Sequence, residues 1–212
     1  KHLGLDQKTK ELLVAPADNV TNFEGIQFLV ENPYWEGAKI SLYSAGEESI
    51  ASMPNIKVGK FITQVILQNI EVEDIDLSNA TDLRSAWVQN NPALQKLDLS
   101  YSTIWGQGDK ETEGNGTYGS SLMVLGCPIL KEIKLPEKNE LKAYRIDIEC
   151  LDALETFDMS NVKMVAELSI GDLNKDFNLV YPELTIFYSE DGYAGTYFAC
   201  SENTFYREST QA

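Results

Sequence analysis

The segment Asn91-Pro-Ala-Leu-Gln-Lys-Leu-Asp-Leu-Ser100 has leucines at its fourth, seventh and ninth positions. Near copies follow at Cys127-Pro-Ile-Leu-Lys-Glu-Ile-Lys-Leu-Pro136 and at Asp152-Ala-Leu-Glu-Thr-Phe-Asp-Met-Ser160. Eight such apolar triples occur in residues 62–170, and their middle residues lie 10, 11, 11, 36, 11, 13 and 11 positions apart. A short motif that recurs at nearly constant spacing indicates a repeat protein.

The triples favour short strands that end in turns. Apolar residues at i, i+3 and i+5 also fit part of a helix face, but these triples are rich in β-branched residues, and Ser, Asn or Pro often follows them. Eleven residues are too few for one coil of a leucine-rich repeat, which runs ~20–29 residues. We therefore predict two triples, and two strands, in each coil of about 22 residues.

The predicted fold is a repeat solenoid of the leucine-rich-repeat class, β-rich with few helices. Its parallel strands stack on two sides of a shared core, because no single repeat can bury its apolar face alone. One side should carry strands centred on Ile75, Leu97, Ile133 and Phe157, and the other side strands centred on Ala86, Tyr144 and Leu168.

One part of the chain is similar to a known family. Val72–Ser100 resembles the doubled leucine-rich repeats of surface proteins from Bacteroidetes-type bacteria, and Gly126–Pro136 is similar to the units of BspA-like repeats. The residue that ends each family repeat is Asn; Asn79 and Asn161 match it, whereas Tyr101 stands in its place in another coil. The resemblance implies export, surface attachment (often as a lipoprotein) and protein or glycan partners.

The charge of the chain argues against nucleic-acid binding. Asp and Glu number 33 against 17 Lys and Arg, which gives a net charge of −16. Nucleic-acid binders neutralise phosphates with clustered basic residues, and a strongly acidic molecule repels a polyanion. We read the acidity as a solubility feature. No apolar run reaches the ~18 residues of a membrane-spanning helix.

Three cysteines, Cys127, Cys150 and Cys200, match no zinc or CxxC spacing. Cys127 and Cys150 precede apolar triples at similar distances, so both are expected to be buried thiols; a disulfide between neighbouring coils remains the alternative. The sequence opens at Lys1 without Met or a visible signal peptide, as in a processed or truncated protein.

Three regions depart from the regular pattern. Residues 1–61 are expected to form an N-terminal cap with degenerate repeats, including a short helix over Lys1–Val14 with Asp6 as its N-cap. Residues 62–170 form the predicted solenoid. Residues 171–212 are rich in aromatics and read as a capping hairpin around Asp191-Gly192, with an aromatic contact surface as the alternative.

The insertion 102–121 lengthens one coil. Its Gly-rich, acidic core, residues 106–119, reads either as a mobile loop or as a binding loop that carries Trp105 and Tyr118. Asp109, Glu111 and Glu113 resemble part of a calcium loop, but Ser120 stands where an EF-hand needs its bidentate Glu. We predict no metal and no cofactor.

The composition argues against catalysis. His2 is the only histidine, so Ser–His and Cys–His nucleophiles lack their base, and no phosphate-binding glycine loop is present. Asp76, Asp98 and Asp158 occupy the outward position of successive strands. A glycosidase places two carboxyls across a cleft, whereas a ladder of repeated Asp is more simply a solvated face.

The sequence therefore predicts an exported, monomeric, non-enzymatic module at the cell surface that binds a protein or glycan. The candidate contact surface carries Trp87 and Arg145 on one sheet, beside Trp105 and Tyr118 in the insertion. Trp87 is expected to face solvent, and exposed Trp, Tyr and Arg are enriched in binding hot spots. The alternatives are a structural segment without a ligand, or a carboxylate-based glycoside hydrolase.

Overall fold

A computed structural model of the chain describes residues 4–6, 11–14, 20–31, 39–44, 50–102, 121–137, 141–180, 185–186 and 198–199. This part of the protein is β-rich, with parallel strands and one short helix, as the sequence predicts at this level. The chain begins with β1 (Gly4–Asp6), β2 (Glu11–Val14) and helix α1 (Ile26–Val30). No helix in the described ranges has the length and apolar character needed to cross a membrane.

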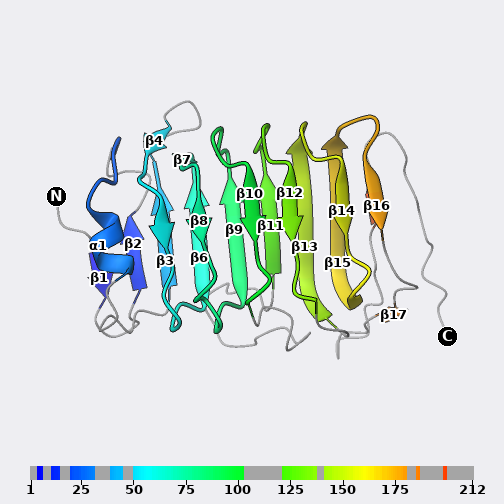
Figure 1. Cartoon of the computed structure of the whole chain (residues 1–212), viewed down its shortest axis with the longest axis horizontal. Helices are drawn as coiled ribbons and strands as arrows, with labels where there is room; N and C mark the ends of the chain where they lie inside the picture. Colours follow the sequence, from blue (N-terminus) through cyan, green and yellow to red (C-terminus); the bar gives the residue numbers. More distant parts are fainter. Residues whose placement is uncertain are drawn as a thin grey trace.

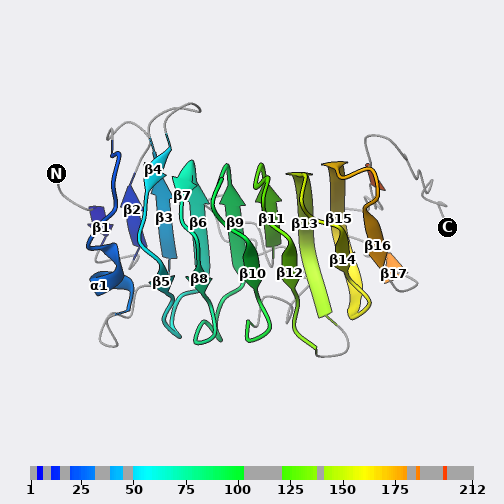
Figure 2. The same cartoon turned by 45° about the horizontal axis from the view of Figure 1, so that its top comes forward.

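A ten-stranded sheet, called here the large sheet, forms one layer of the molecule (Figures 1 and 2). Its strands follow the order β1-β2-β3-β6-β9-β11-β13-β15-β17, and β18 also pairs with β15. All pairs are parallel except β1 with β2. The strands after β2 are β3 (Lys39–Tyr43), β6 (Gln64–Gln68), β9 (Ser85–Gln89), β11 (Ser121–Leu125), β13 (Leu141–Leu151), β15 (Val162–Leu173), β17 (Thr185–Ile186) and β18 (Phe198–Ala199).

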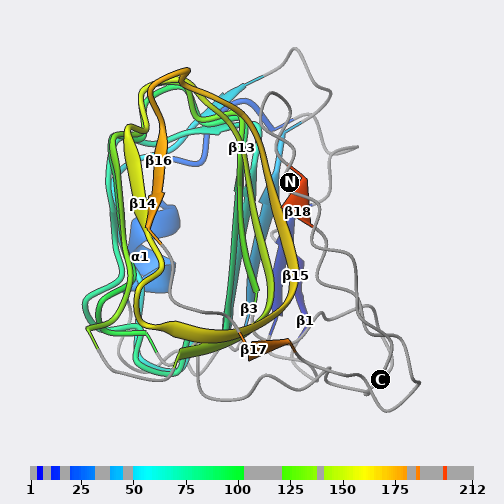
Figure 3. The same cartoon turned by 90° about the vertical axis from the view of Figure 1, so that its right-hand side faces the viewer.

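Between these strands the chain crosses to shorter ones, which pair in parallel as β4–β7, β5–β8, β10–β12 and β14–β16. Figure 3 looks along the stack and separates β14 and β16 from the large sheet. The outer surface of β5, β8, β10, β12, β14 and β16 is called here the short-strand face. The bounds are β4 (Ala51–Ser52), β5 (Ile56–Lys57), β7 (Ile70–Glu71), β8 (Ile75–Asp76), β10 (Lys96–Asp98), β12 (Glu132–Lys134), β14 (Thr156–Asp158) and β16 (Asn178–Val180).

One hydrophobic core lies between the two layers. Ala86 and Val88 of β9 enter it from the large sheet, and Leu97 of β10 and Leu99 just after that strand enter it from the other side; all four are buried. Successive side chains of a strand point to opposite faces. The alternation therefore explains why the last two apolar residues of each triple stand two positions apart along the chain.

A column of left-handed residues crosses five neighbouring strands of the large sheet, directly after β6, β9 and β11 and one residue before the ends of β13 and β15. Asn69, Asn90, Gly126, Cys150 and Asp172 all have φ between 49° and 63°. Asn and Asp tolerate this conformation better than other residues with a Cβ, and Gly adopts it freely. Neighbours in the column also interact, since Asn90 Nδ2 donates a hydrogen bond of 2.7 Å to Asn69 Oδ1.

The Asp residues of the Asp-x-Ser segments form the turns that end β8, β10 and β14. In each segment the Asp Oδ1 accepts a hydrogen bond from the backbone N–H of the Ser two residues later. The distances are 2.9 Å for Asp76 and Ser78, 3.0 Å for Asp98 and Ser100, and 2.8 Å for Asp158 and Ser160. This Asx turn gives the repeated Asp a structural role that the sequence analysis missed.

The predicted strand centres agree with the structure except in one coil. Ile75, Leu97, Ile133 and Phe157 lie in β8, β10, β12 and β14, and Ala86 and Leu168 are paired positions of the large sheet. Tyr144 was the wrong centre, because Ile146 is the residue in register with Leu168. The sequence analysis also missed β11, whose Leu122 is in register with Ala86.

Both termini differ from the predicted elements. Residues 4–6 and 11–14, which fall in the predicted helix, form the antiparallel pair β1–β2. At the other end, β17 and β18 both run parallel to β15, so the described parts of the predicted hairpin do not pair antiparallel with each other. In both places a neighbouring strand at the edge of the large sheet supplies backbone hydrogen-bonding partners. This pairing outweighs the helix or hairpin preference of the local sequence.

Candidate functional site

The middle row of the outer face of the large sheet is largely buried. The row runs through register partners on six neighbouring strands, and every second residue of these strands points away from the core. Ser41, Ile66, Met123 and Asp147 are buried, while Trp87 and Ser169 are half-buried. This row is therefore not an open contact surface.

Trp87 points away from the core, as predicted, but it is half-buried rather than fully solvent-facing. Its Nε1 is enclosed and finds no hydrogen-bond acceptor among the described residues. A buried donor without a partner costs about 1–3 kcal/mol. Trp105 and Tyr118, the other two aromatic candidates, lie outside the described residues, as do the acidic residues of the calcium-loop alternative.

Arg145 does not occupy the position that matches Trp87. Met123 is in register with both Trp87 and Asp147, so Asp147 is the matching residue and Arg145 lies one row away, in register with Ser121. The mismatch arises because 24 residues separate Ser121 from Arg145, whereas 21 separate Gln64 from Ser85.

Arg145 and Asp147 form a shielded ion pair. Arg145 Nη2 lies 2.7 Å from Asp147 Oδ2, and the Asp147 side chain is only 6% exposed. Burial raises the pKa of Asp147, the Arg145 guanidinium opposes that rise, and the Glu149 charge adds to it. Glu149 in turn accepts a hydrogen bond of 2.7 Å from Ser169. The ion pair and the hydrogen bond fix the positions of these side chains on β13 and β15.

The short-strand face, by contrast, carries two open grooves. The first groove lies between β8 and β10, which are not hydrogen-bonded to each other, and has a volume of about 230 Å³. Its floor is apolar and its walls are charged; Asp74, Ile75, Asp76, Leu77, Ser78, Lys96, Asp98 and Tyr101 line it. Tyr101 is 59% exposed.

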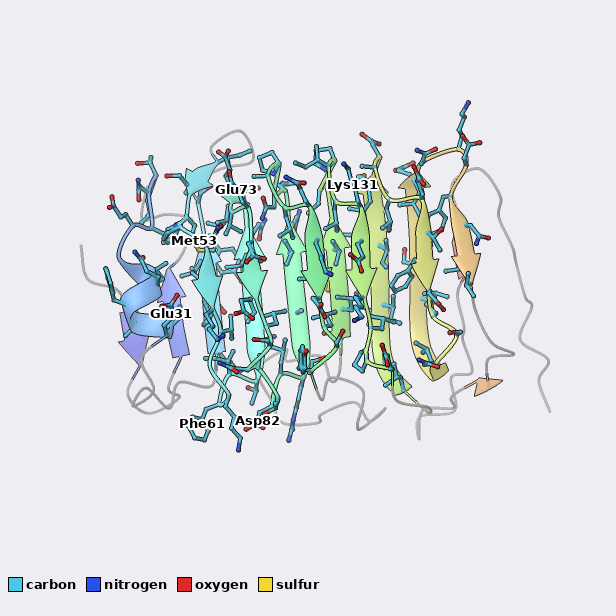
Figure 4. All side chains as sticks on the ribbon, viewed as in Figure 1. Glu31, Met53, Phe61, Glu73, Asp82 and Lys131 are labelled. Carbon is cyan, nitrogen blue, oxygen red and sulfur yellow. The ribbon has the colours of Figure 1, made fainter. Side chains whose placement is uncertain are left out.

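The second groove lies between β12 and β14 and measures about 450 Å³. Ile133 and Leu135 contribute an apolar part to its lining, and Glu137, Glu155 and Asp158 stand there with Lys131 and Lys134. Figure 4 draws the side chains of this face, with Lys131 at the upper edge of the strands. A volume of this size falls within the range of small-ligand sites.

A ladder of ion pairs crosses the short-strand face beside the grooves. Lys57 Nζ lies 3.0 Å from Asp76 Oδ2, and Lys96 Nζ lies 3.1 Å from Glu132 Oε2 and 3.7 Å from Asp98 Oδ2. These side chains are a third or more exposed, so each pair stabilises the fold by less than about 1 kcal/mol. The ladder fixes the positions of charges rather than adding much stability.

The carboxyls of the first groove are poorly suited to acid catalysis. The hydrogen bond from Ser78 lowers the pKa of Asp76, with further help from Lys57. For Asp98, burial acts to raise the pKa, but the hydrogen bonds from Ser100 and the charges of Lys96 and Lys134 outweigh it, so the pKa is lowered. A general acid needs a raised pKa. The described residues also contain no group of three metal-binding side chains.

The two described cysteines differ, although both were expected to be buried. Cys127 is buried, and burial raises the pKa of its thiol to about 11. Cys150 is exposed because it occupies the left-handed corner that Gly126 occupies one coil earlier. Partial removal of water from the thiol, and then the negative charge of Asp172, raise the pKa of Cys150. The reactive thiolate is therefore disfavoured. Neither forms a disulfide.

A comparison of the chain with models of protein families gave no match, and comparisons with curated proteins and with solved structures gave none either.

One residue in the sequence could have indicated the position of the first groove. Tyr101 stands where the family repeat ends in Asn, and this position is at the rim of the first groove.

Proposed function

We propose that the chain is a leucine-rich-repeat-like solenoid that serves as an exported, cell-surface binding module without catalytic activity. The regular register supports this proposal: Gln64, Ser85, Ser121, Arg145 and Glu167 follow one another across five parallel strands. Such ladders arise when each coil repeats the path of the previous one. Export, surface attachment and a protein or glycan partner rest on the resemblance of Val72–Ser100.

The observation that carries the binding proposal is the contrast between the two faces. The row that includes Trp87 is largely buried, whereas the short-strand face has two open grooves with charged walls and one strongly exposed aromatic, Tyr101. Binding sites are concave and combine apolar contact with a few fixed polar groups. We therefore favour the short-strand face over the surface of Trp87 and Arg145.

Two features support a non-catalytic role. His2 is the only histidine of the chain, and the groove carboxyls Asp76 and Asp98 are held ionised by turn hydrogen bonds and lysines. The same bonds favour one competing function, a structural segment without a ligand, because they give each Asp a role in the fold.

The full chain, immobilised on a sensor surface, should be screened against arrays of glycans and extracellular proteins. We expect at least one partner whose binding is weakened by Tyr101→Ala and by Glu155→Ala, one substitution in each groove, and is unchanged by Phe28→Ala. Phe28 is an exposed aromatic of α1 away from both grooves, so it controls for the general loss of an aromatic side chain. A complete absence of partners would favour the structural segment.

A further inference from the structure

We propose that the short-strand face docks a basic, extended segment of a partner protein, with cationic side chains entering the first and second grooves. This inference rests on the proposed binding function and names the chemistry of the partner. Four observations support it: the charge of each groove, the position of Tyr101, the distance between the grooves and the net charge of the chain.

Both grooves have an excess of negative charge. In the first groove Asp74, Asp76 and Asp98 outnumber Lys96, and that lysine is already engaged by Glu132 and Asp98. Asp74 forms no ion pair with any described residue. Its carboxylate is therefore available to a cation from outside.

The second groove repeats this arrangement on a larger scale. Four carboxylates, those of Glu132, Glu137, Glu155 and Asp158, stand there against the two ammonium groups of Lys131 and Lys134. The chain as a whole carries a net charge of −16. A field of this sign attracts basic partners and raises their rate of association.

Tyr101 makes the first groove more than an acidic surface. The residue is 59% exposed and lines the same groove as Asp74, Asp76 and Asp98. The face of an aromatic ring attracts Lys and Arg, and Arg more often. A guanidinium that enters this groove would meet the ring and a carboxylate together.

The distance between the grooves fits an extended chain. The β10–β12 pair separates them, so the centres of the two grooves lie at least two strand spacings, roughly 10 Å, apart. In a polyproline II segment, an extended conformation with three residues per turn and a rise of about 3.1 Å per residue, residues i and i+3 point to the same side and lie roughly 9 Å apart. A segment that crosses the short strands with a basic residue at every third position could therefore fill both grooves.

The test uses fluorescein-labelled peptides and the full chain. One peptide repeats Arg-Ala-Ala, and the second has the same composition with its arginines grouped at one end. Fluorescence anisotropy at low salt should give tighter binding of the first peptide, and added salt should weaken it because the groove charges are partly exposed. Circular dichroism of each variant checks that the chain remains folded.

Variants then locate the binding. Asp74→Asn and Tyr101→Ala are each expected to weaken binding of the spaced peptide roughly two- to five-fold, and Tyr101→Phe should retain it. Glu31→Gln is the matched control, since Glu31 is an exposed carboxylate at the end of α1, outside both grooves. Its substitution should leave the affinity unchanged.

Two results would overturn the inference: no binding of either peptide at low salt, or an equal loss of affinity in Glu31→Gln and Asp74→Asn, which would indicate non-specific attraction by net charge. If the peptides fail but a neutral glycan from the array loses affinity in Tyr101→Ala, the inference is wrong while the proposed binding function stands. If the peptides fail and the array gives no partner either, both are wrong.

Discussion

Gly126→Ala should destabilise the protein by about 2–3 kcal/mol. Gly126 has φ of +63°, in the left-handed corner column. A residue with a Cβ pays roughly 1–2 kcal/mol to adopt this conformation. The new Cβ would also lie 2.5 Å from Oδ1 of Asn90, which is too close for the amide to keep its place.

The second contribution comes from the amide of Asn90. If it rotates away from the new methyl group, its 2.7 Å hydrogen bond to Asn69 is lost, at a cost of about 0.5–1.5 kcal/mol. In an Asn90→Ala background this bond and the close contact are already absent. Gly126→Ala should then cost only the ~1–2 kcal/mol of the backbone conformation.

Denaturant unfolding of the parent, the two single variants and the double variant measures the coupling between the two positions, for which we expect about 1 kcal/mol. Gly59→Ala is the matched control. Its Cβ would meet only Val30 O at 3.6 Å, an ordinary contact, and its φ is not left-handed, so its effect should stay within about 1 kcal/mol. Equal losses for Gly126→Ala and Gly59→Ala, or no coupling to Asn90, would refute the account of the corner.

Three further predictions concern the same layers. Leu97→Ala should cost roughly 2–5 kcal/mol, because Leu97 is fully buried, and Asp98→Ala only about 0.5–1.5 kcal/mol, because it loses a turn hydrogen bond; equal losses in thermal melts would contradict the pattern. The pKa of Asp98 is lower in the folded chain than the value near 3.8 expected when it is unfolded. The ionised carboxylate therefore stabilises the fold above pH 3.8, and this contribution is lost as the pH falls through the folded pKa. In an acid titration, Asp98→Asn should lose less stability below about pH 4 than the parent does. Iodoacetamide at pH 8 should label the exposed Cys150 before the buried Cys127, whose pKa is about 11, as peptide mapping would check.

The spacing of the triples was enough to predict β8, β10, β12 and β14 in one layer and β9 and β15 in the other. Leu97 and Ile133 were placed correctly because a buried residue must recur wherever the coil returns to the core, and they are register partners across 36 residues. The parallel direction followed from the same argument, since in the proposed solenoid each coil repeats the path of the one before.

The number of residues in each coil could not be predicted from the sequence. The insertion concealed β11, because Gly119 stands where its triple would begin. The following coil spans 24 residues from Ser121 to Arg145, two more than the next one from Arg145 to Glu167, so Tyr144 was chosen in place of Ile146 and Arg145 in place of Asp147. An error of two residues leaves the inward and outward faces unchanged, which is why an apolar pattern does not detect it.

The candidate site was harder to predict for a different reason. A residue that points away from the core is not always exposed to solvent. Burial of the row that includes Trp87 depends on how the chain packs in space, which the sequence pattern does not describe. The grooves arise where neighbouring short strands fail to pair, at β8–β10 and β12–β14. Such a gap leaves no mark in the periodicity of the sequence.

The most direct test of the winding is a disulfide between β10 and β12. Lys96 and Glu132 are register partners, and paired strands lie about 4.8 Å apart, within the ~4.4–6.8 Å that Cα atoms need for a disulfide. Lys96→Cys with Glu132→Cys should therefore cross-link under mild oxidation, as mass spectrometry of the joined peptides would show. Lys96→Cys with Lys134→Cys is the control, because the added two-residue offset places these Cα atoms roughly 8 Å apart. Efficient cross-linking of the first pair alone is the predicted result; failure of that pair, or equal cross-linking of both, would contradict the parallel winding on which the account rests.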